Sequence, residues 1–119
     1  MAGPEWTHEA HLVAGYWYVR KLGAVDALTE VRTRIMRFND SVGTPNSDTR
    51  GYHETITRLY LDAIAAHMAG LPPGATFEEG LARLLSSPLA NSAWPLTRYS
   101  RERLFSVQAR RGWVEPDQP

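Results

Sequence analysis

The chain has 119 residues, of which 43% are hydrophobic, so we expect one domain with a single core over residues 1–119. Its 13 basic and 13 acidic residues cancel, and this balance argues against nucleic acid or an anionic membrane surface as a partner. The absence of cysteine excludes disulfides, thiolate metal sites and cysteine nucleophiles. No apolar stretch approaches the ~20 residues of a membrane-spanning helix, and residues 1–5 do not form a signal peptide. We therefore expect a cytoplasmic protein without a membrane partner.

Hydrophobic spacing, interrupted by glycine and proline, predicts four helices, which cover about 7–22, 25–39, 52–69 and 76–87. Thr7 is a suitable N-cap for the first helix, and Gly23 is a suitable residue at its end. Residues 76–79 read Thr-Phe-Glu-Glu, a capping box that opens the short fourth helix.

Two segments are expected to contain no long helix. Residues 40–51 combine Gly, Pro, Asn, Ser and Asp, a composition typical of a loop, and this loop is long enough to cover a pocket. Residues 89–119 indicate short helical turns, with Ser100 and Ser106 as caps. The expected fold is all-α: an irregular bundle of three main helices, a short fourth helix and a C-terminal segment of short helical turns.

Three of the four histidines can meet if the first and third helices are neighbours with their N-terminal ends at the same level. His8 and His11 are one helical turn apart, and His53 opens the third helix on its inward-facing stripe. Three neutral imidazoles around an open position suit a zinc-like divalent ion. The i, i+3 spacing differs from the i, i+4 pair of the zinc-protease helix motif. The hypothesis is a metal site made by His8, His11 and His53.

The same residues allow two interpretations without a metal. In one, His53 is the acid or base of a metal-free pocket. In the other, the histidines are structural, because a helix N-terminus keeps an imidazole neutral without a metal. Glu54, about 100° round the helix from His53, could be a fourth ligand, an orienting partner or a general base. The expected cofactor is therefore either none or a single divalent ion.

Further candidates lie near these histidines and in the C-terminal segment. Arg101 and Arg103, beside the phenol of Tyr99, could clamp a carboxylate or phosphate, although a solvated helix explains them at least as well. Trp6 and Tyr52 lie close in sequence to candidate histidines and could form an apolar wall for an aromatic substrate. A glycine-rich phosphate loop is absent, so no nucleotide cofactor is expected.

Three short blocks carry a resemblance to a known family. They read Trp-Thr-His-Glu-Ala-His-Leu at 6–12, Tyr-His-Glu-Thr-Ile-Thr at 52–57, and Tyr-Ser-Arg-Glu-Arg-Leu-Phe-Ser at 99–106. With these blocks the chain resembles a family of small, mostly uncharacterised bacterial proteins. The resemblance implies one shared feature formed by His8, His11, His53, Thr57, Tyr99 and Arg101. It implies no settled activity, but such proteins often look like members of metabolic or natural-product gene clusters, which favours a pathway enzyme. Glu54 stands where the family varies.

The expected function is a small pathway enzyme whose histidine-lined pocket performs acid–base or metal-assisted chemistry on a small organic substrate, aromatic and anionic in character. Cyclisation, condensation and elimination are the expected reaction types. The expected catalytic residues are His53, Glu54 and Arg101. The expected substrate-binding residues are Trp6, Tyr52, Thr57, Tyr99 and Arg103. The alternatives are a non-catalytic accessory protein for a larger enzyme and a histidine-based metal carrier or sensor; a homodimer stays open.

Overall fold

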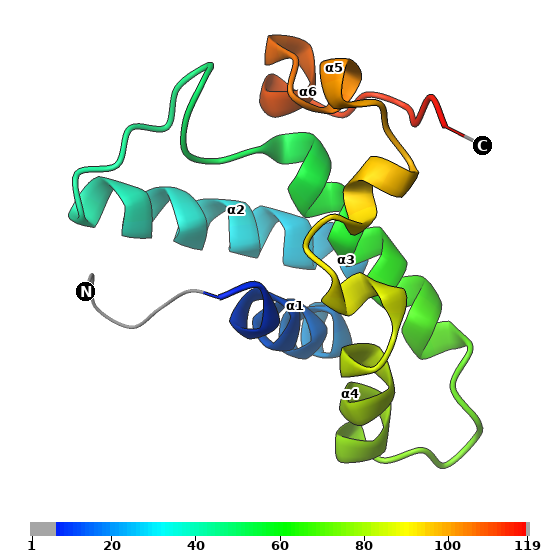
Figure 1. The fold of residues 1–119 in the computed structure, drawn as a ribbon. Coiled ribbons are helices and arrows are strands. Elements are labelled where there is room, and N and C mark those ends of the chain that lie inside the picture. The colour runs from blue at the N-terminus through cyan, green and yellow to red at the C-terminus, as the bar shows by residue number, and fades with distance from the viewer. Residues whose placement is uncertain (1–6, 119) are drawn as a thin grey trace.

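The computed structural model describes residues 7–118. Within this range the chain is all-α and contains no β-strand. Its helices are α1 (His8–Leu22), α2 (Ala24–Ser41), α3 (Glu54–Ala69), α4 (Phe77–Leu85), α5 (Arg101–Leu104) and α6 (Val107–Arg111), with 3₁₀ turns η1 (Pro88–Ala90) and η2 (Trp94–Thr97). Figure 1 shows α1, α2 and α3 as the main bundle, with α4 below α1 and the α5–α6 pair above the start of α3. The predicted irregular bundle is confirmed.

The predicted caps set most helix boundaries. The Thr7 hydroxyl accepts a hydrogen bond from the Ala10 amide at 3.1 Å and starts α1. Gly23 adopts a φ of 82°, which a residue with a side chain rarely tolerates, and so joins α1 directly to α2. Thr76 and Glu79 form the capping box of α4. Serine hydroxyls cap α5 and α6, as predicted.

The third helix begins later than the sequence suggested. The prediction placed its start at Tyr52 and His53 on its inward stripe, but α3 begins at Glu54 and His53 is its N-cap. The imidazole of His53 accepts a hydrogen bond from the Ile56 amide, the bond that a Ser or Asp cap usually accepts. This two-residue difference decides which way the imidazole faces.

The main core lies between the first four helices. Its buried residues are Leu12, Tyr16, Val19, Ala27, Leu61, Ile64, Leu84 and Leu89. Helices α1 and α3 approach closely at Gly15, where an added Cβ would lie 3.1 Å from Cδ1 of Ile64. This close approach packs α1 against α3, so that the His8 ring at the start of α1 contacts Tyr60 of α3.

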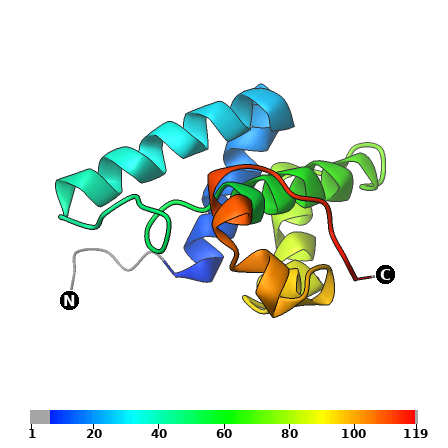
Figure 2. The ribbon, with the colours of Figure 1, turned by 90° about the horizontal axis from the view of Figure 1, so that it is seen from above.

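A second core holds the C-terminal segment against α3. Leu59, Tyr99 and Leu104 are buried there, and Trp113 packs against them from the tail. The Tyr99 phenol donates to the Val114 carbonyl at 2.6 Å. Seen from above, the C-terminal segment runs over α3 (Figure 2). None of the helices in residues 7–118 is long and apolar enough to cross a bilayer.

Candidate functional site

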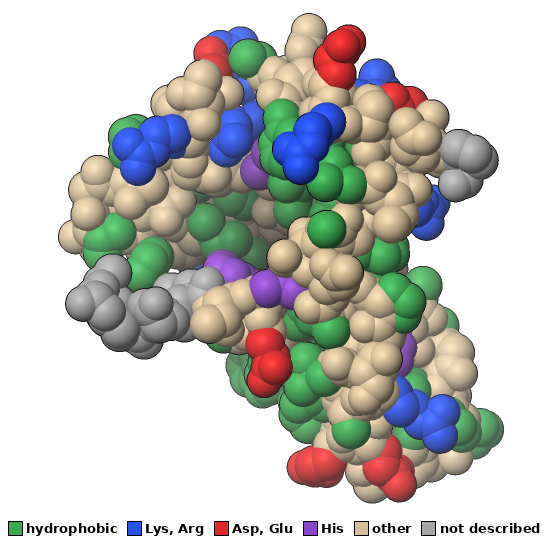
Figure 3. Space-filling model, in the orientation of Figure 1, with side chains coloured by type: hydrophobic (Ala, Val, Ile, Leu, Met, Phe, Trp, Pro, Cys, Tyr) green, Lys and Arg blue, Asp and Glu red, His purple; other side chains and the backbone are tan. Residues whose placement is uncertain are grey.

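A cavity of about 390 Å³ opens between α1, α2 and α3, beside the loop that joins α2 to α3. Its walls are mostly apolar and come from all three helices: Leu12, Val31, Ile35, Ile56, Leu61 and Ile64. Figure 3 shows the hollow, with hydrophobic side chains on its floor and histidine side chains beside it. Its size falls within the ~300–1,000 Å³ of small-molecule sites.

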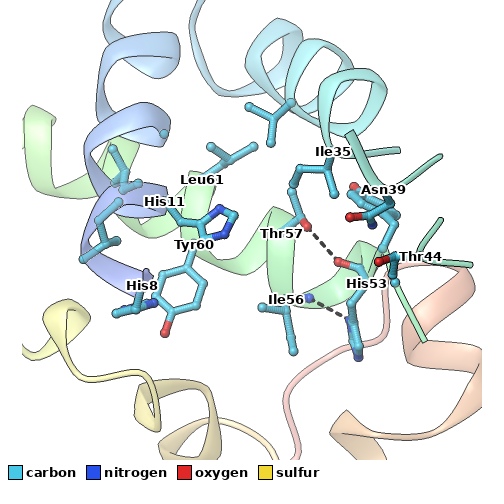
Figure 4. Close-up of a pocket in the computed structure, with 16 residues that line it drawn as sticks. His8, His11, Ile35, Asn39, Thr44, His53, Ile56, Thr57, Tyr60 and Leu61 are labelled. Carbon is cyan, nitrogen blue, oxygen red and sulfur yellow. Dashed lines mark hydrogen bonds between the residues drawn. The ribbon is translucent and has the colours of Figure 1, made fainter. Parts of the chain in front are cut away.

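His8 and His11, from the first turn of α1, lie on one side of this cavity (Figure 4). The His8 ring packs edge-on to Tyr60, with ring centroids 5.1 Å apart, and its Nε2 donates to the Leu89 carbonyl at 2.7 Å. His11 stays accessible at the cavity mouth. Loss of hydration lowers the pKa of His11, and repulsion from His8 lowers it further. His11 therefore presents a neutral imidazole to the cavity at neutral pH.

His53 also lines the cavity, but both of its ring nitrogens are engaged. Nδ1 accepts from the Ile56 amide at 3.1 Å, and Nε2 donates to the Leu104 carbonyl at 2.7 Å. This arrangement fixes one neutral tautomer of the ring. Burial also favours the neutral ring, because it lowers the pKa of His53. Figure 4 shows its ring directed away from His11. In this structure His53 is the N-cap of α3, and its role as acid, base or metal ligand stays a prediction.

His8, His11 and His53 do not converge on a common point in this structure (Figure 4). No three or more His, Cys, Asp or Glu side chains within the described range are placed to hold a metal ion together. The cause is the cap geometry: the lone pair of His53 that a metal would need is used by the Ile56 amide. His8 and His11 line the same cavity, but their expected third ligand points elsewhere.

Glu54 faces a second hollow on the other side of Tyr52. Its carboxylate accepts two hydrogen bonds from Arg32, at 3.0 and 2.7 Å, and one from the Tyr52 phenol at 2.7 Å. Burial tends to raise the pKa of Glu54, but the bonds from Arg32 and Tyr52 outweigh it and the pKa is lowered. Glu54 is therefore the ionised partner of a fixed ion pair, and it does not line the histidine cavity.

The remaining predicted residues divide between the cavity and the C-terminal core. Tyr52 and Thr57 line the cavity. Tyr99 is fully buried in the second core, so it cannot contact a ligand there. Arg101 is exposed and lies 5.7 Å from the Phe105 ring, and Arg103 donates to the Glu115 carbonyl.

Neither arginine lines the cavity, so the predicted anion clamp of Arg101, Arg103 and Tyr99 is not part of this site. Trp6 lies outside the described residues.

Asn39 and Thr44 are among the cavity residues that the sequence reasoning missed. They line the end of the cavity opposite His8 and His11 (Figure 4). A signal existed for Asn39, because Val31, Ile35 and Asn39 follow one another at four-residue spacing. A polar residue that continues an apolar helical stripe indicates a polar contact on the buried face. For Thr44, in the loop, no such signal exists.

Arginines from α6 hold the α2–α3 loop over the site. Arg110 donates to the carbonyls of Gly51 and Tyr52 at 3.0 and 3.4 Å. Arg111 forms a two-bond ion pair with Asp48, each bond 2.7 Å long. Thr44 and Gly51 of this loop line the cavity, which confirms that the loop covers a pocket.

In comparisons with known proteins, the chain matches no family model, no curated protein and no solved structure.

Proposed function

We propose that the protein is a small enzyme that binds an organic molecule in the cavity between α1, α2 and α3 and transfers protons with His11. The observation that carries the proposal is the position of His11 at the mouth of an apolar cavity of about 390 Å³, with a lowered pKa. Sites of this kind combine an apolar binding volume with a titratable group whose pKa is perturbed. The proposed base is thus one turn along α1 from His8 rather than at the start of α3.

The chemistry that suits a single neutral imidazole is a redox-neutral proton transfer. His11 accepts a proton from a C–H or O–H bond of the substrate, and the electron pair left behind forms the new bond of an elimination or a ring closure. The imidazolium then returns the proton to the leaving group. Burial and the neighbouring His8 lower the pKa of His11, so His11 stays neutral until it takes up the proton of the substrate.

The Arg32–Glu54–Tyr52 network supports this site from outside. Tyr52 lines both the cavity and the second hollow, and its phenol is held by Glu54 at 2.7 Å. Burial raises the pKa of Tyr52, and the bond to Glu54 raises it further. Tyr52 therefore stays a neutral wall of the cavity instead of acting as a second base.

The test uses small-molecule extracts of bacterial cells, incubated in D₂O with wild-type protein or with His11→Gln. We expect the wild type to consume at least one metabolite, or to place deuterium at one of its carbon atoms, as followed by mass spectrometry. Loss of a general base should slow this change roughly a hundredfold or more in His11→Gln. His67→Gln is the matched control, since His67 bonds to the Gly80 carbonyl away from the cavity. Equal changes with the wild type and His11→Gln, or no change with either, would contradict the proposal.

A further inference from the structure

The polar groups of the cavity lie at two ends, with apolar side chains between them. Figure 4 shows His8, His11 and Tyr60 on one side and Asn39 and Thr44 on the other. The Tyr60 phenol lies 3.5 Å from the Asn91 carbonyl, and burial raises its pKa to about 12. The end near α1 therefore belongs to the proposed chemistry, and the end near the α2–α3 loop has no assigned task.

The hydrogen bonds of the loop determine which atom Asn39 offers to the cavity. The Tyr52 amide donates to Oδ1 of Asn46 at 3.1 Å, and a backbone amide can only donate, so this atom must be the oxygen. The same oxygen accepts from Nδ2 of Asn39 at 2.9 Å. The amide nitrogen of Asn39 thus donates to the loop, and its Oδ1 is the atom that can accept a hydrogen bond from a ligand.

Two hydroxyl groups stand beside this acceptor. Thr57 donates its proton to the His53 carbonyl at 2.8 Å, so toward a ligand its oxygen acts as an acceptor. The Thr44 hydroxyl has no hydrogen-bond partner among residues 7–118 and can donate or accept. This end of the cavity is therefore suited to a ligand group that donates a hydrogen bond.

The cavity also lacks a counter-charge for an ionic ligand. Of its described lining residues, none is Asp, Glu, Lys or Arg. Arg32 and Arg110 line the second hollow instead, where Glu54 and the loop carbonyls engage them. A carboxylate or phosphate placed in the cavity would lose its hydration without gaining an ion pair.

We infer that the cavity selects an uncharged ring compound that carries a hydroxyl or amide N–H, and that this group donates to Oδ1 of Asn39. The inference rests on the proposed function for the identity of site and substrate, and it replaces the anionic substrate expected from Arg101 and Arg103. An apolar cavity of about 150 Å³ holds one benzene ring, so about 390 Å³ has room for a fused two-ring body.

Three probes of one shape separate the possible chemistries: 2-naphthol, naphthalene and 2-naphthoate. Their affinities are measured at neutral pH by backbone amide NMR titration of the full chain. We expect 2-naphthol to bind about tenfold more tightly than either of the others, as one net hydrogen bond allows. Equal or tighter binding of 2-naphthoate would overturn the uncharged-ligand inference. Equal binding of naphthalene, or no binding of any probe, would overturn the role of the polar end.

Variants locate the preference at Asn39. Asn39→Leu and the nearly isosteric Thr44→Val should each bring 2-naphthol toward the affinity of naphthalene and leave naphthalene itself unchanged. Thr44→Val tests the same end of the cavity if Asn39→Leu unfolds the loop. Ser41→Ala is the matched control on the same helix, because Ser41 is exposed and does not line the cavity. A preference that survives in both Asn39→Leu and Thr44→Val would overturn the inference.

Failure of this inference is distinguishable from failure of the proposed enzyme. Binding of the probes needs the cavity and Asn39 but no proton transfer by His11, so His11→Gln should keep the preference for 2-naphthol. If the probes bind as expected and the D₂O experiment finds no turnover, the ligand class stands and the catalytic role of His11 falls. If turnover depends on His11 but an anionic compound is the substrate, the enzyme stands and the ligand class falls.

Discussion

Of the three imidazoles that line the cavity, His53 and His11 differ in burial: the His53 side chain is buried, and the His11 side chain is exposed. His53 uses both nitrogens within the fold, one toward Ile56 and one toward Leu104. His11 sits at the mouth, where a ligand can reach it. Proximity to a cavity is thus not sufficient for a catalytic role; a base also needs a nitrogen that can reach the substrate.

Replacing His53 should therefore affect stability more than chemistry. His53→Ala removes a helix cap worth about 1 kcal/mol and leaves the buried Leu104 carbonyl without its donor, at a further cost of about 1–3 kcal/mol. His53→Asn restores a capping oxygen, so it should recover the stability of the cap but not that of the hydrogen bond to the Leu104 carbonyl. Urea unfolding followed by circular dichroism measures both. If His53→Ala unfolds at the wild-type urea concentration, the capping role is wrong.

The lowered pKa of His11 gives a second prediction at this scale. The neutral ring is the proposed base, so activity should be full at pH 7 and fall only as the pH drops through the lowered pKa, below the usual 6.5. NMR titration of the His11 ring in labelled protein measures this midpoint without a substrate. His8→Gln should move the midpoint upward, toward 6.5, because it removes the repulsion from His8. A wild-type midpoint at or above 6.5 would contradict the assigned environment.

At the scale of helices, the sequence predicted those helix ends that are determined by residues within one turn of them. The bounds of α1 and α4 follow from Thr7, Gly23 and the 76–79 capping box, all of which act within one turn of the helix end. The start of α3 was missed because a histidine seldom serves as an N-cap. A sequence pattern does not distinguish a capping imidazole from one in the first turn.

The partners that decide the site are far apart in the chain. His53 meets Leu104 across 51 residues, and Arg32 meets Glu54 across 22. Helical periodicity gives which face of a helix is apolar, but it does not give which arginine reaches which carboxylate. This is why the sequence indicated the apolar faces of the helices but not the partners of His53, Glu54 and Arg101.

The loop between α2 and α3 should depend on Arg110 for its order. Its bonds to the carbonyls of Gly51 and Tyr52 hold the end of the loop beside the cavity. Arg110→Ala should therefore raise amide hydrogen exchange over residues 43–52 several-fold and leave exchange in α1 unchanged. Arg111→Ala is the matched comparison, since its pair with Asp48 is exposed and such pairs contribute little. Unchanged exchange in Arg110→Ala would show that the loop is ordered by other contacts.

For the whole molecule, α3 contributes side chains to both cores. One half packs with α1, α2 and α4, and the other holds the C-terminal segment through Leu59, Tyr99 and Leu104. Thr55 is fully buried and directly precedes Ile56 and Thr57, which line the cavity. The shape of the cavity therefore depends on contacts made by the end of the chain.

Thr55 tests this dependence, because its single hydroxyl connects α3 to the C-terminal segment through two hydrogen bonds. It donates to the Gly112 carbonyl at 2.8 Å and accepts from the Val114 amide at 3.2 Å. Thr55→Val keeps the volume and leaves both backbone groups without their partner, so it should reduce the free energy of unfolding by about 1–3 kcal/mol. Thr55→Ser keeps the hydroxyl and should lose less than half as much. Urea unfolding gives both values, and amide NMR shifts report the change at Ile56 and Thr57. If Thr55→Val matches the wild type in stability and in these shifts, the C-terminal segment does not support the cavity.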